Sequence, residues 1–154
     1  YLNNKSVEIN GLKFIGSTLW SYIDNLNKNL YIGDYGMISY NTEKNMRLTN
    51  KMFFENIKYL QKNIEQCNLP TVVLTHHLPS FGFISEKYKN NKYNFAYASN
   101  IDYMIKEPVK LWLAGHTHNH IDKIINGVRC CVNPYGHHVE STGFMYDKVI
   151  TLEY

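Results

Sequence analysis

The sequence predicts an α/β protein with a mixed β-sheet and flanking helices. Two short apolar runs, "TVVLT" at 71–75 and "VKLWLA" at 109–114, are too short for helices and are bounded like buried strands. An amphipathic stripe at 53–64 precedes the first of them and indicates a helix. Asn-Gly pairs at 10–11 and 126–127 each separate two β-rich runs, as tight hairpin turns do.

The first element is a β-hairpin in "SVEINGLKFIGSTLW", residues 6–20. Asn10-Gly11 is the dipeptide that most readily adopts the positive φ angles of a type I′ turn. A less regular region, rich in asparagine and tyrosine, then extends to about Arg47.

A helix follows in "LTNKMFFENIKYLQKNIEQCNLP", residues 48–70. We expect Thr49 or Asn50 to cap its start, and Asn68 and Pro70 to end it. Its apolar positions follow one another at spacings of four, three and four residues: Phe53, Ile57, Leu60 and Ile64.

After the strand at 71–75, the segment "SNIDYMIKEP" predicts a second helix. Ser99 and Asp102 resemble a capping box, and Pro108 closes the segment. We expect the strand at 109–114 to lie parallel to the first, through a right-handed crossover. A hairpin in "HIDKIINGVRCCVN" and a final strand in "KVITLEY", residues 148–154, complete the order.

Composition indicates a globular protein, and we expect one domain over residues 1–154, part of a larger one because the chain begins with Tyr1 instead of methionine. The net charge of +3 is too small and scattered to indicate a nucleic-acid patch. No apolar run is long enough to span a membrane. Three cysteines, an odd count without a C-x-x-C pair, favour a reduced, intracellular and cytoplasmic setting.

Histidines follow both predicted buried strands. His76 and His77 come directly after the first, while His116, His118 and His120 follow the second. Parallel strands place their carboxyl ends at one edge of the sheet, where open α/β sheets bind ligands. Neutral imidazole is a good ligand for zinc, iron and manganese, so the pattern predicts a metal site.

Three segments also resemble a known family: "VVLTHHLPS" at 72–80, "LAGHTHNH" at 113–120 and "VNPYG" at 132–136. Together they resemble the C-terminal half of calcineurin-like metallophosphoesterases, and "VEINGLKFIGSTLW" resembles the strand pair that follows the Gly-Asn-His-Glu motif of that family. The resemblance implies half of a four-layer αββα sandwich. It also implies a two-metal centre, with divalent ions such as manganese, iron or zinc, that hydrolyses phosphate mono- or diesters.

The resemblance assigns roles to individual residues. His76 and His116 match the histidine ligands of the second metal, and His118 matches the histidine that reaches the first metal. His77 matches a position that faces the substrate or supports the ligands. Asn133 and Gly136, outside the ligand set, match positions that shape a turn.

The chain also departs from the family pattern. It has no Asp-x-His, Gly-Asp-x-x-Asp or Gly-Asn-His motif. "GDYGM" at 33–37 has Met37 where the second aspartate would stand, so we expect Asp34 to lie in a turn or at a helix start. The resemblance therefore implies a phosphoesterase whose upstream half supplies the other ligands, and an isolated 154-residue chain that is inactive.

Two alternatives remain open. The chain could be a non-catalytic binding or pairing module of the same fold, or a structural zinc module that uses His116, His118 and His120. Four aromatic residues in 77–98 either stack on a substrate or pack on the domain: Tyr88, Tyr93, Phe95 and Tyr97. We expect His137 and His138 to be surface residues, and a half-domain to expose a sheet face and an edge strand that promote self-association.

Overall fold

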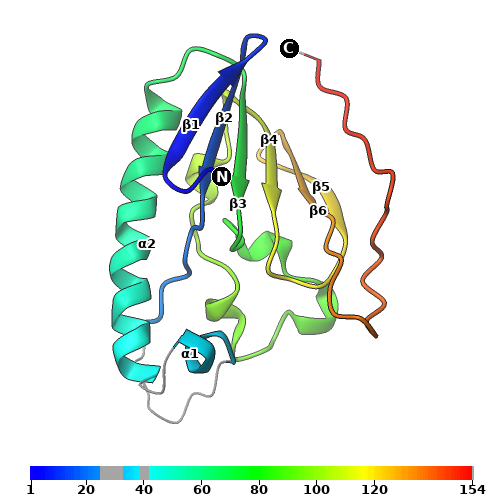
Figure 1. Cartoon of the computed structure of the whole chain (residues 1–154). Helices are drawn as coiled ribbons and strands as arrows, with labels where there is room; N and C mark the ends of the chain where they lie inside the picture. Colours follow the sequence, from blue (N-terminus) through cyan, green and yellow to red (C-terminus); the bar gives the residue numbers. More distant parts are fainter. Residues whose placement is uncertain (25–32, 39–41, 154) are drawn as a thin grey trace.

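In the computed structural model, which describes residues 1–24, 33–38 and 42–153, six strands form one mixed sheet in the order β1-β2-β3-β4-β6-β5 (Figure 1). The inner strands β2, β3, β4 and β6 are parallel, while β1 and β5 pair antiparallel at the two edges. The predicted α/β class with a mixed sheet is therefore confirmed. The strand bounds are β1 Lys5–Ile9, β2 Leu12–Ser17, β3 Thr71–Thr75, β4 Val109–Ala114, β5 Ile121–Ile125 and β6 Val128–Val132.

Both predicted hairpins are confirmed, and their turns have the backbone that the sequence indicates. Asn10 and Gly11 have φ angles of 51° and 78°, and Asn126 and Gly127 have 51° and 81°. Two consecutive positive φ angles define the type I′ turn, whose twist matches that of the flanking strands.

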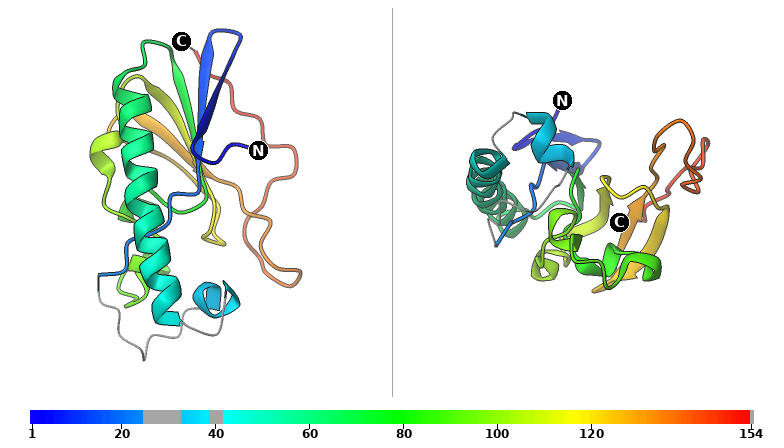
Figure 2. Two further views of the ribbon diagram at one scale, coloured as in Figure 1. Left: turned by 60° about the vertical axis from the view of Figure 1, so that its left-hand side comes forward. Right: turned by 90° about the horizontal axis from the view of Figure 1, so that it is seen from below.

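The long helix α2, Thr42–Glu65, runs along one side of the sheet (Figures 1 and 2). Its end agrees with the prediction, but its start does not, because Thr49 and Asn50 lie inside it. Thr49 donates its hydroxyl hydrogen to the Met46 carbonyl at 3.1 Å. The Asn50 amide instead bonds the backbone N–H and C=O of Ile23, both at 2.8 Å. Both residue types commonly cap helices, but here Thr49 bonds a carbonyl within the helix and Asn50 bonds a distant part of the chain.

The predicted helix in 99–108 is wrong. The segment forms only the short 3₁₀ helix η4, Asp102–Met104. Ser99 does not cap it, and the Asp102 carboxylate accepts a hydrogen bond from the Ser80 hydroxyl at 3.0 Å. Ile101, Met104 and Ile105 are buried at the three- and four-residue spacing of a helix face, so the apolar pattern alone does not distinguish this turn from an α-helix. The N–H groups of Ser99 and Ile101 instead donate to the carbonyls of Leu78 and Pro79, both at 3.0 Å, which holds the start of the segment against the preceding loop.

The remainder of the β3–β4 connection also lacks an α-helix. Residues 77–98 contain three 3₁₀ helices, η1 Phe81–Phe83, η2 Glu86–Tyr88 and η3 Asn94–Ala96. This connection and α2 cover one sheet face and enclose the larger core, which includes the fully buried Trp112.

The opposite sheet face carries a smaller apolar cluster around Val72, Leu111 and Cys131. Ile150 and Leu152 pack against it from the C-terminal segment. The predicted strand at 148–154 is wrong for the described residues 148–153, which form no ladder. The alternation of apolar residues there is satisfied by packing on the sheet face, so it does not require pairing with an edge strand.

The three cysteines, Cys67, Cys130 and Cys131, are free, as the sequence indicates. Among the described residues, no helix has the length and apolar character needed to cross a bilayer.

Candidate metal site

The ends of three neighbouring strands hold the first histidine pair. The Thr18 carbonyl, next to β2, accepts hydrogen bonds from the N–H groups of His76 and His77 at 3.2 and 3.1 Å. Gly115, next to β4, donates its N–H to the His76 carbonyl at 2.9 Å. The chain after β3 is therefore fixed between the strands on both sides of it.

A second set of contacts fixes His77 from the core. The Trp112 indole N–H donates to the Thr75 hydroxyl at 3.0 Å, and that hydroxyl donates to the His77 carbonyl at 2.8 Å. The His77 ring is 5.0 Å from the Trp20 ring, and the residue is only 2% exposed. His77 thus lies beneath the site, and the substrate contact that the sequence suggested for it stays a prediction.

The turn after β4 brings His116 against His76. A Cβ atom on Gly115 would lie 3.4 Å from His76 Nδ1, an ordinary van der Waals distance, so Gly115 lies directly beside the His76 ring. His116 has a φ of 62°, an uncommon left-handed conformation that costs on the order of 1 kcal/mol. A strained backbone at such a position is typical of functional sites.

The rings of His76, His77 and His116 form one cluster. The His116 ring centroid is 4.9 Å from that of His76 and 4.2 Å from that of His77. The predicted convergence of histidines from two parallel strands is thus confirmed for these residues. Their role as metal ligands stays a prediction.

The protonation state of this cluster suits a cation. Burial, followed by the neighbouring His76, lowers the pKa of His116 to about 4, and burial also lowers the pKa values of His76 and His77. The three rings are therefore neutral near pH 7, the state that binds metals. His116 Nε2 and His77 Nδ1 are buried and make no hydrogen bond within the described part of the chain. An unpaired buried nitrogen is costly unless it has a partner, so His116 Nε2 fits a metal ion.

Asp34 also reaches this cluster, which the sequence did not indicate. It lies in the first turn of α1, Gly33–Ile38, as expected of a helix-start residue. Its Oδ2 is 3.8 Å from His116 Nε2, too far for a hydrogen bond, and its side chain is 51% exposed. The negative charge of Asp34 raises the pKa values of His76 and His116, opposing the effect of burial.

Of the four aromatic residues singled out in segment 77–98, Tyr97 faces the cluster. The Tyr97 ring stacks on the His116 ring at 4.7 Å and 30°. Tyr93 and Phe95 instead pack against a small core that contains Ile23. The packing alternative therefore holds for these two residues, while Tyr97 borders the site.

His118 points to different partners. Its Nδ1 is 2.5 Å from Glu140 Oε2, and its ring is 4.9 Å from the His137 ring. His118 is still near enough to lower the pKa values of His76 and His116 electrostatically. The backbone N–H of His137, more than His118 itself, lowers the pKa of Glu140. His137 is exposed, as expected, but its contact with His118 was not predicted.

The third histidine after β4 has another environment. His120 Nε2 is 3.3 Å from the Lys148 ammonium, and its backbone N–H donates to the Thr142 carbonyl at 2.8 Å. In the described part of the chain, His120 belongs to no group of three closely spaced ligand atoms. The structural zinc alternative, with His116, His118 and His120 together, receives no support from this geometry.

Asn133 and Gly136 shape the loop after β6, in agreement with the resemblance. The Asn133 amide exchanges two hydrogen bonds with the Met145 backbone, at 2.8 and 2.9 Å. Gly136 has a φ of 75°, and a Cβ atom there would lie 2.7 Å from Glu140 Oε2. Only glycine allows the Glu140 carboxylate to sit so close to this turn.

Comparison with known proteins gives a relative without an assigned activity. The chain is 31% identical, over 158 aligned residues, to the uncharacterized protein L509 of Acanthamoeba polyphaga mimivirus. The alignment covers 93% of this chain and 56% of that protein, so the chain spans about half the length of the relative it matches. No protein-family model matches the chain.

Sequence reasoning located the histidines at the strand ends but missed Asp34, His137 and Glu140 as neighbours. A pattern was available for two of them, because "YGHHVE" places histidines and a glutamate directly after a glycine. No local pattern indicates that Asp34 approaches His116, since a long connection separates the two residues.

Proposed function

We propose that this chain carries part of the two-metal centre of a calcineurin-like phosphoesterase, which hydrolyses phosphate mono- or diesters. One observation carries the proposal: His76 and His116, from the ends of adjacent parallel strands, meet with their rings 4.9 Å apart, and His116 Nε2 is buried without a hydrogen-bond partner among the described residues. The mixed α/β sheet supports it as the C-terminal half of the sandwich that the resemblance implies.

In this proposal His76 and His116 hold the second metal and His118 reaches the first. Divalent ions held there would supply a hydroxide near neutral pH and would neutralise charge on the phosphate. The His77 ring packs against the His116 ring, with ring centroids 4.2 Å apart, and would help to hold it in place. Tyr97, stacked on His116, covers one side of the ligand and restricts water near it.

The proposed centre needs ligands beyond these histidines. A carboxylate bridges the metals in the family, and the aspartate, asparagine and leaving-group histidine motifs are not in this sequence. We therefore propose that an upstream half of the same domain is the partner of this chain, and that the 154 residues alone bind metal without catalytic turnover.

The test measures manganese and zinc binding by titration calorimetry, together with hydrolysis of aryl phosphate mono- and diesters. His116→Ala is expected to weaken metal binding roughly tenfold or more, because it removes a direct ligand. His120→Ala is the matched control, since its ring contacts Lys148. Equal metal affinity in wild type and His116→Ala contradicts the proposed ligand role.

The assay also separates the proposal from the non-catalytic alternative. Robust hydrolysis by the isolated chain, abolished in His116→Ala, would show that our count of missing ligands is wrong. Reading the coding sequence before Tyr1 for the three upstream motifs, in the family order, tests the class itself. Metal binding without hydrolysis in a protein that contains those motifs would favour a binding or pairing module.

A further inference from the structure

The loop after β6 brings two further ligand-type side chains to His118. Glu140 Oε2 is 2.5 Å from His118 Nδ1, and the rings of His137 and His118 are 4.9 Å apart. One potential ligand atom from each residue lies within 4.8 Å of the other two. The phosphoesterase resemblance assigns a role to His118 alone among these three.

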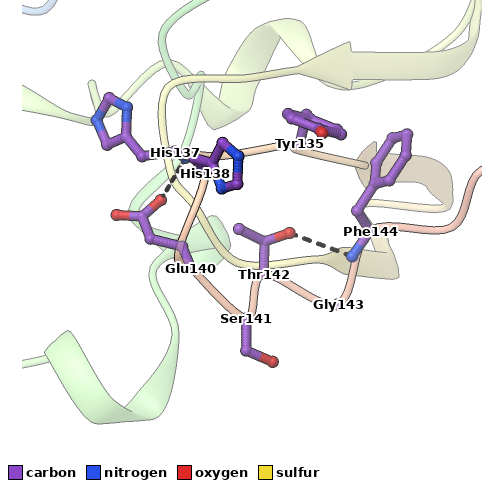
Figure 3. Close-up of a pocket in the computed structure, with 8 residues that line it drawn as sticks. All are labelled: Tyr135, His137, His138, Glu140, Ser141, Thr142, Gly143 and Phe144. Carbon is purple, nitrogen blue, oxygen red and sulfur yellow. Dashed lines mark hydrogen bonds between the residues drawn. The ribbon is translucent and has the colours of Figure 1, made fainter.

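The loop holds this arrangement through its own hydrogen bonds. The Glu140 carboxylate accepts from His137 N at 2.8 Å, drawn as a dashed line in Figure 3, and Glu140 N donates to the His137 carbonyl at 3.0 Å. The Thr142 hydroxyl donates to the Pro134 carbonyl at 2.6 Å. Gly136 leaves the space that the carboxylate occupies. The carboxylate is thus oriented by the backbone before any cation binds.

We propose that His118, His137 and Glu140 bind one transition-metal dication of the zinc type. Two imidazole nitrogens and one carboxylate oxygen are a ligand set that zinc takes, and three protein ligands leave a fourth position open. His118 and Glu140 have side chains 38% and 37% exposed, so a cation can enter from solvent. His137 and Glu140 also line a surface pocket, and Figure 3 shows their ring and carboxylate on one side of the loop, away from the rings of Tyr135 and Phe144.

The geometry requires only small movements. Ligand atoms about 2.0–2.1 Å from a tetrahedral zinc lie about 3.3 Å from one another. The His118–Glu140 contact would open to that distance, and the farthest pair would close to it from at most 4.8 Å. The inference rests on these contacts alone, and it shares only His118 with the proposed phosphoesterase centre.

The test titrates the 154-residue chain with zinc by calorimetry and with cobalt by visible absorption, which reports four-coordinate binding. His137→Ala and Glu140→Gln are each expected to weaken zinc binding at this site roughly tenfold or more and to reduce the cobalt absorption. His138→Ala is the matched control, a neighbouring exposed histidine outside the group, and should bind as wild type does.

His116→Ala separates this inference from the proposed function. Zinc binding that remains in His116→Ala, and that His137→Ala or Glu140→Gln reduces in that background, supports the His118 site whatever the fate of the phosphoesterase proposal. Wild-type affinity and cobalt absorption in His137→Ala and Glu140→Gln overturn it. An equal loss in His138→Ala also overturns it, because it would indicate non-specific binding to exposed histidines.

Discussion

At the scale of single residues, His116 combines features that rarely occur together in a side chain without a function. Its backbone is left-handed, its Nε2 is buried and unpaired within residues 1–24, 33–38 and 42–153, and its ring lies among His76, His77 and Tyr97. The left-handed backbone and the unpaired nitrogen each cost free energy in the metal-free protein. A bound cation would offset the cost at Nε2, which is why we place the ligand role here.

The lowered pKa of His116 predicts how stability depends on pH in the presence of a chelator. The pKa falls from 6.5 to about 4 on folding, so between these values the unfolded chain binds a proton that the folded chain does not. The free energy of unfolding should be level above pH 6.5 and fall as the pH decreases to 4. The loss from this residue is on the order of 3 kcal/mol.

Urea unfolding at a series of pH values checks this prediction. Carboxylates also titrate near pH 4, so the informative quantity is the difference between wild type and His116→Gln, which removes the titrating ring. The pH dependence should be weaker in His116→Gln and unchanged in the exposed control His138→Gln. Parallel curves for wild type and His116→Gln would show that His116 is not protected from protons in the fold.

At the scale of elements, the first turns of α2 show how tertiary contacts extend a helix. The apolar stripe predicts a start near Thr49, but the helix begins at Thr42. The added turns include the buried Met46, which packs with Ile23 and Ala96. Asn50 then joins the helix to the chain after β2 through its two bonds to Ile23.

Asn50→Ala should therefore destabilise the protein by about 1–3 kcal/mol, because it leaves the N–H and C=O of Ile23 without their partner. Arg47→Ala, on the same helix, removes an exposed ion pair with Glu43 and should cost no more than about 0.5 kcal/mol. Urea unfolding measures both. Equal effects of the two substitutions would show that the Asn50–Ile23 contact contributes little to the free energy of unfolding.

At the scale of the whole molecule, the sheet has one well-covered face and one partly covered face. The larger core lies under α2 and the β3–β4 connection. On the other face Ile150 and Leu152 reach the cluster around Leu111, while Leu12 and Leu74 there are only partly buried. This partly covered face is where we propose that the upstream half of the domain packs.

The exposed edge strand β1 predicts that the chain self-associates. All five residues of β1 are exposed, with Val7 at 41% and Ile9 at 51%. An exposed edge strand that carries apolar side chains can pair with another copy of the chain. We expect Val7→Lys to lower the average molecular mass measured by analytical ultracentrifugation at high protein concentration. Lys5→Arg should leave that mass unchanged. A wild-type chain that stays monomeric at every concentration tested would contradict the prediction that the exposed edge strand promotes self-association.

The sequence by itself determined the features that depend on short-range backbone preference and on runs of apolar residues. These are the two Asn-Gly hairpins, the parallel strands at 71–75 and 109–114, the end of α2 and the histidines at the strand ends. Apart from the parallel pairing of the two strands, which follows from a topology rule, each is decided within a few residues, so a local pattern suffices to predict it.

Only the tertiary structure decided the start of α2, the 3₁₀ geometry at 102–104 and the packing of 148–153 without a strand. It also decided that Asp34 approaches His116 and that Glu140 reaches His118. The physical reason is the same in each case. Which hydrogen-bond or packing partner a side chain finds depends on residues far away in the chain, and the three-dimensional fold alone brings those residues close.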